Sequence, residues 1–106
     1  KGQSGTARTY AYKAIEANPS SKDAYIMIGD LYMSSGNSCS SADDLQGRLV
    51  YIAAYDKYKK AGATSKMADA KAQFPTMETI FSHNKNIGDV MNTGCWIGED
   101  VKLEKR

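Results

Sequence analysis

The chain has 106 residues, of which 42% are hydrophobic and 25% charged, and its 14 basic and 12 acidic residues give a formal net charge of +2. This size suits one domain or a fragment of a repeat array, and the composition is ordinary for a soluble globular domain. The basic residues form no stripe, and no apolar run approaches the roughly 20 residues of a membrane span, which argues against a nucleic-acid binder and a membrane-spanning segment.

The first third of the chain is predicted to form two helices. Residues 6–18 place small and apolar side chains on one face, at Ala7, Ala11, Ala14 and Ile15. Pro19 should end this helix, because the residue before a proline is disfavoured in the helical region. We expect Ser20 to cap a second helix that stops at Gly36. Since the pattern is helical from the start at Lys1, we expect a piece excised from a longer protein.

A polar loop that contains Cys39 follows the second helix. A third helix is predicted over residues 44–61, where apolar residues recur at helical spacing, and it should end at Gly62. Two shorter helices should come next, one over 64–74 and one that Thr76 caps.

Beyond Gly88 the pattern changes from helical spacing to near alternation, which predicts a β-hairpin. Its strands lie in "DVMN" and "DVKLEKR", with Val101 and Leu103 on one face, and "CWIG" lies in or beside the turn. Helices followed by a small strand pair indicate a cap at the end of a helical array.

The helices carry the spacing of a tetratricopeptide repeat. The first helix of that repeat has an aromatic residue, then Leu-Gly and then Tyr, and the spacing recurs here in Tyr25, Ile28, Gly29 and Tyr32. Gly29 would lie where two helices cross closely, because a side chain there would hold them apart. A second copy follows after about 44 positions instead of roughly 34, with the excess in the loop around Cys39. We therefore predict antiparallel TPR-like helix pairs over residues 1–63 and a cap of two short helices and the hairpin over 64–106.

The end of the chain resembles the C-terminal region of exported bacterial tetratricopeptide proteins. Those proteins typically end in a phenylalanine–proline step, a second phenylalanine and a CWI-x-E motif, and the matching residues are Phe74, Pro75, Phe81, Cys95, Trp96, Ile97 and Glu99. The resemblance implies an exported protein, periplasmic or associated with the outer membrane, with a scaffolding role and no established catalytic activity.

Cys39 and Cys95 are the two cysteines of the chain, and both lie in segments predicted to be irregular. With one histidine they cannot supply the four ligands of a structural zinc site, so we expect no metal and no cofactor. A disulfide between them would tie the insertion to the cap, and closing so long a loop would stabilise the fold by roughly 4 kcal/mol. The resemblance implies the oxidising compartment that such a bond needs. Free buried thiols and a reactive thiol are the alternatives.

Trp96 is interpreted as part of a structural cap. A terminal repeat leaves one apolar face uncovered, and the residues expected to cover it are Trp96, Ile97, Phe74, Phe81 and Ile80. The tyrosines at positions 51, 55 and 58 share one helical stripe, which predicts that they face the core.

The concave groove of tetratricopeptide arrays lies along the first helix of each pair. The corresponding residues here are Asp23, Ile26, Met27, Asp30 and Met33. Two methionines beside two aspartates would suit an adaptable apolar contact with a peptide that has basic flanks. The alternative is that Ile26 and Met27 pack on an upstream repeat.

From these patterns we expect a non-catalytic protein-interaction or scaffold module of the bacterial cell envelope, with a protein or peptide partner. One alternative is the binding of glycans or cell-wall fragments by exposed tyrosines and Trp96. The other is a thiol-dependent enzyme that uses Cys95.

Overall fold

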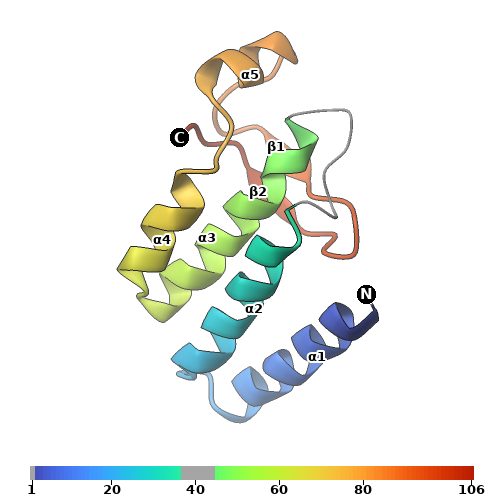
Figure 1. Ribbon diagram of the computed structural model, residues 1–106, viewed down its shortest axis with the longest axis vertical. Coiled ribbons are helices and arrows are strands. Elements are labelled where there is room, and N and C mark those ends of the chain that lie inside the picture. Colours follow the sequence, from blue (N-terminus) through green and yellow to red (C-terminus); the bar gives the residue numbers. More distant parts are fainter. Residues whose placement is uncertain (1, 37–44) are drawn as a thin grey trace.

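The computed structural model describes residues 2–36 and 45–106, and in these ranges the protein is mainly helical with a two-stranded antiparallel sheet at its C-terminal end (Figure 1). The helices are α1 (Gly2–Ala17), α2 (Lys22–Ser34), α3 (Leu49–Ala61), α4 (Thr64–Lys71) and α5 (Met77–Ser82), and the strands are β1 (Val90–Asn92) and β2 (Asp100–Lys102). The predicted class, a mainly α fold that ends in a β-hairpin, is confirmed.

Three of the predicted helix boundaries follow directly from local chemistry. The first helix ends at Ala17, just before Pro19. The third ends at Gly62, which adopts the left-handed conformation (φ 68°) that glycine reaches without a steric penalty. Thr76 caps α5, because its side-chain oxygen accepts a hydrogen bond from the backbone N–H of Thr79 at 3.1 Å.

Three details of the helix predictions were wrong. The capping position of α2 is Ser21 rather than Ser20, and its side chain makes no capping hydrogen bond. The third helix begins as a short 3-10 turn, Gln46–Arg48, before α3 continues it. Ala14 is exposed, because α1 lies against α2 with Ala11 buried and Ile15 partly buried, and the rest of its surface faces outward.

Successive helices pack side by side, α1 on α2, α2 on α3 and α3 on α4 (Figure 1). The close crossing predicted at Gly29 is confirmed, since a Cβ atom there would lie 2.5 Å from the ring of Tyr58 on α3. Gly36, which follows the end of α2, has the same role, because a Cβ there would meet the hydroxyl of Tyr51. The two glycines therefore give room for two tyrosines of α3.

The core lies between α2, α3 and the C-terminal segments. Its largest fully buried side chains are Tyr32, Phe74, Ile28, Leu45, Leu49, Ile80, Leu103, Val50 and Pro75. Of the predicted tyrosine stripe, Tyr58 is buried, whereas Tyr51 and Tyr55 are partly buried and pack against the core.

The hairpin joins the end of the chain to α3. Met91 lies opposite Val101 in the strand register, and Val101 and Leu103 are both buried, as their shared face predicts. The loop between the strands, residues 93–99, carries the "GCWIGE" sequence. No helix in the described ranges is both long and apolar enough to cross a membrane.

Candidate functional site

The loop 93–99 is built on three residues in the left-handed conformation. Gly94, Cys95 and Gly98 have φ values of 64°, 59° and 58°, and this conformation is uncommon for a side chain such as that of Cys95. The backbone N–H of Thr93 donates to the carbonyl of Glu99 at 2.8 Å, and the N–H of Glu99 donates to the hydroxyl of Thr93 at 3.0 Å. The two glycines thus let the chain close into a compact loop.

Trp96 is held on three sides. Its indole Nε1 donates to the hydroxyl of Ser35 at 2.9 Å, and its ring meets the ring of Tyr32 edge-on at 5.6 Å between centroids. The guanidinium of Arg8 lies 4.9 Å from the centre of the indole ring, within reach of a cation–π interaction. Trp96 is therefore a packed anchor of the loop on α1 and α2.

Arg8 connects α1 to this loop. It donates hydrogen bonds to the carbonyl of Ile97 at 2.8 Å, to the carbonyl of Trp96 at 3.3 Å and to the hydroxyl of Tyr32 at 3.1 Å. The role of Arg8 was not predicted from the sequence. The available signal was its spacing, since Arg8 lies three and seven positions before the inward-facing Ala11 and Ile15.

Glu99, the last residue of the motif, is the centre of a polar cluster. One carboxylate oxygen accepts from Lys57 at 3.1 Å, and the other accepts from the hydroxyl of Tyr32 and, at 3.4 Å, from that of Tyr12. Burial raises the pKa of Tyr32, and its bond to Glu99 raises it further, because both disfavour the phenolate. Lys57 and Tyr32 are buried, so the cluster of Glu99, Lys57, Tyr32 and Tyr12, which we call the clamp, holds the loop against α2 and α3.

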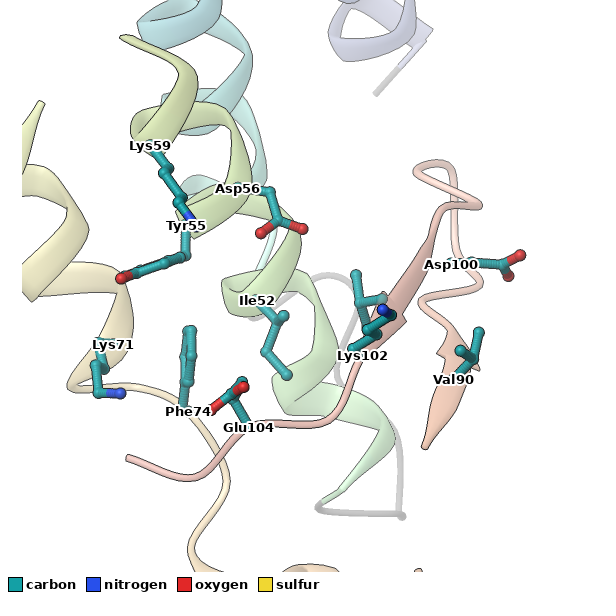
Figure 2. A pocket seen from close by; sticks show the side chains of 11 residues that line it. Ile52, Tyr55, Asp56, Lys59, Lys71, Phe74, Val90, Asp100, Lys102 and Glu104 are labelled. Carbon is teal, nitrogen blue, oxygen red and sulfur yellow. The ribbon is translucent and has the colours of Figure 1, made fainter. Parts of the chain in front are cut away.

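A cavity of about 600 Å³ is lined by residues of α3, the end of α4 and the hairpin (Figure 2). Its apolar and aromatic lining residues are Ile52, Tyr55, Phe74, Val90 and Val101, of which Ile52, Phe74 and Val101 form its buried floor. In Figure 2, Lys71 and Phe74 lie on one side of Ile52, and Val90 and Lys102 of the hairpin lie on the other side. The volume is within the range of pockets that bind ligands, roughly 300–1,000 Å³.

Six charged side chains surround this cavity, three of each sign. They are Lys59, Lys71, Lys102, Asp56, Asp100 and Glu104. Among the described residues none of the six forms an ion pair. Partial burial raises the pKa of Asp56 in spite of the nearby Lys57. The cavity thus combines an apolar floor with six charged side chains that form no ion pair among the described residues.

The predicted groove residues share one face of α2 but do not line this cavity. Asp30 accepts hydrogen bonds from the hydroxyl of Tyr58 at 2.6 Å and from Lys66 at 3.2 Å. Ile26 and Met33 pack against the core of this chain, while Asp23 is exposed and Met27 is 49% exposed. Asp30 is therefore occupied within the protein, and Met27 is the apolar side chain of the set that is open to solvent.

The predicted cap is divided between two places. Trp96 and Ile97 contact α1 and α2, whereas Phe74 packs edge-on against Tyr55 of α3, with ring centres 5.4 Å apart. The assignment of Phe81 was wrong, because its side chain is 56% exposed. Its neighbour Ile80 is the fully buried residue of α5.

Cys95 is disulfide-bonded. Cys39 lies outside the described residues, so the Cys39–Cys95 pairing stays a prediction. A cysteine held in a disulfide offers no thiolate nucleophile, which argues against a thiol enzyme based on Cys95.

Comparisons with protein-family models, with curated proteins and with solved structures find no match to this chain.

Proposed function

We propose that this chain is a non-catalytic protein-interaction module of tetratricopeptide type, belonging to a scaffold protein of the bacterial cell envelope, and that it binds a partner polypeptide in the cavity between α3 and the hairpin. The observation that carries this proposal is the composition of the cavity: an apolar floor bordered by six charges of both signs without ion pairs among the described residues.

The balance of charge around the cavity favours a polypeptide over a nucleic acid. A phosphate backbone gains its affinity from neutralisation by basic side chains, and the carboxylates of Asp56, Asp100 and Glu104 would repel it. A polypeptide can carry acidic and basic residues together with apolar ones, which matches every group around this cavity.

Glycan binding by Trp96 has less support. A sugar platform needs an open aromatic face, whereas the indole of Trp96 lies between Arg8 and Tyr32 and its N–H is donated to Ser35.

Two observations support the tetratricopeptide type and the envelope location. The close contact of Gly29 with Tyr58 lies where that repeat brings its two helices together. A disulfide at Cys95 fits an oxidising compartment such as the periplasm.

The test is the selection of binders to this chain from a random peptide library, followed by affinity measurement on two variants with equal net charge. One variant carries Lys59→Glu and Lys71→Glu at the cavity. The control carries Lys13→Glu and Lys22→Glu, which are exposed positions on α1 and at the start of α2. We expect the selected peptides to lose at least tenfold in affinity on the cavity variant and less than threefold on the control.

Circular dichroism of both variants checks that the fold is kept. Equal affinity for both variants, or a larger loss on the control, would show that binding takes place elsewhere and would contradict the proposed function.

A further inference from the structure

The hydrogen bonds of the hairpin define which backbone groups face outward. Thr93 donates to Glu99, and Leu103 donates to Asp89, each at 2.8 Å. In an antiparallel pair, hydrogen-bonded and non-hydrogen-bonded positions alternate. The pairs Val90–Lys102 and Asn92–Asp100 are therefore the non-hydrogen-bonded ones. It follows that the N–H and C=O groups of Asp100 and Lys102 point away from β1, toward the outer edge of β2.

The two outer edges of the hairpin differ in their contacts. On β1, the side-chain amide of Gln46 donates to the carbonyls of Asn92 and Thr93, at 2.9 and 2.8 Å. On β2, the outward backbone groups of Asp100 and Lys102 have no hydrogen-bond partner within the described ranges. Both residues also line the cavity (Figure 2). The unpaired edge of the sheet therefore borders the proposed binding site.

We propose that the partner binds as an extended segment that adds a third strand to the outer edge of β2. This inference rests on the proposed function and names the conformation of the ligand. An extended backbone presents alternating donors and acceptors at the spacing that the edge of β2 offers. A helical ligand uses its own backbone groups internally and would leave those of Asp100 and Lys102 unpaired.

The strand register also predicts the side-chain pattern of the partner. In a strand added to β2, the residue opposite Val101 points to the same face as Val101, toward the apolar floor at Ile52. The residues on either side of it stand beside Asp100 and Lys102, where opposite charges are favourable across strands. An antiparallel partner therefore presents an acidic, an apolar and a basic residue in that order, with the acidic one opposite Lys102.

The probe is the peptide acetyl-Ser-Glu-Val-Lys-Ser-amide, titrated into the isotope-labelled chain and followed by amide chemical shifts. In the antiparallel register the N–H groups of its glutamate and lysine face β2, whereas that of its valine faces away. Methylation of the glutamate backbone nitrogen should weaken binding at least tenfold. Methylation of the valine nitrogen, the matched control, should change it less than threefold.

A protein variant tests the other hydrogen bond of the same residue pair, in which the N–H of Lys102 donates to the glutamate carbonyl of the peptide. Lys102→Pro removes an N–H that β1 does not use, so the hairpin ladder is kept, and Lys102→Ala removes only the side-chain charge. We expect the proline variant to lose at least fivefold more affinity than the alanine variant. The peptide comparison needs no change in the protein, so it decides the matter even where the proline variant fails to fold.

Two results would overturn the inference. If the peptide methylated at glutamate binds at the cavity as tightly as its parent, then strand addition is wrong while the cavity remains a polypeptide site. If the parent peptide shifts no cavity amide at millimolar concentration, strand addition is also wrong. The proposed function is then decided separately by the library selection, which assumes no conformation of the ligand.

Discussion

The clamp around Glu99 can be tested by the substitution Glu99→Gln, which keeps the size of the side chain and removes its charge. Lys57 and Glu99 are in contact at 3.1 Å, and their side chains are 10% and 24% exposed. At this separation two charges attract by about 5 kcal/mol in a medium of effective dielectric constant near 20, and the cost of removing both ions from water offsets part of this attraction.

With Gln in place of Glu99, the Lys57 ammonium stays largely buried and loses its ion-pair partner. Removing one partner of a buried pair typically costs about 3–5 kcal/mol, and the partial exposure of Glu99 lowers this to roughly 2–3 kcal/mol because water can reach the site. At about 4–8 °C per kcal/mol for a small domain, the melting temperature should fall by roughly 10–20 °C. Thermal unfolding by circular dichroism measures this, and Trp96 fluorescence reports whether the loop loosens.

A double-mutant cycle isolates the interaction between the two residues. Lys57→Met removes the buried cation, so Lys57→Met combined with Glu99→Gln should be more stable than Glu99→Gln alone by about 1 kcal/mol or more. Glu104→Gln removes an exposed charge of the same type and should change stability by less than about 0.5 kcal/mol. A loss below about 0.5 kcal/mol for Glu99→Gln, or strict additivity in the cycle, would refute the clamp.

Gly29→Ala should lower the free energy of unfolding by about 1–3 kcal/mol in chemical denaturation, because the added Cβ would overlap the ring of Tyr58. Gly5→Ala has open space around it and should stabilise α1 by about 0.5–1 kcal/mol. A gain in stability at both sites would contradict the close crossing at Gly29. Burial and a hydrogen bond to a carboxylate raise the pKa of Tyr32 and of Tyr58 above the usual value of 10.0. The stability that these two protonated phenols contribute is therefore fully present below about pH 10 and is lost as the pH rises above that value. Tyrosinate absorbance should therefore show two groups that ionise only with alkaline unfolding. Because Cys95 is disulfide-bonded, reductant should lower the free energy of unfolding by about 2–5 kcal/mol. In the native, unreduced chain the cysteines should resist alkylation, and free alkylation of Cys95 would contradict the disulfide.

Local chemistry made most of the fold predictable. Pro19, Gly62 and Thr76 each act on the backbone within a few residues, so the helix ends that depend on them were predicted from neighbours in the chain. The hairpin was predicted from alternation, which is also a local signal. Phe81 shows where such signals stop: Phe81 and Ile80 were both expected in the cap, but of the two Ile80 is buried and Phe81 is exposed. Helix α5 has six residues, too few to define an inward face.

The clamp and the cavity depend on contacts between distant segments of the sequence. Lys57 is 42 positions from Glu99, and Arg8 is 89 positions from Ile97. In the sequence these charges are indistinguishable from those of a solvated surface. The groove on α2 was predicted from the resemblance, and its Asp30 proved to be bound by side chains of α3 and α4, which spacing along α2 cannot show.

An amide chemical-shift map of the chain, saturated with a peptide selected from the library, locates the bound polypeptide directly. We expect the largest shifts at the cavity, on Ile52, Asp56, Asp100 and Lys102. Largest shifts on the α2 face from Asp23 to Met33, or none above those given by a scrambled peptide, would contradict the assignment of the cavity as the binding site.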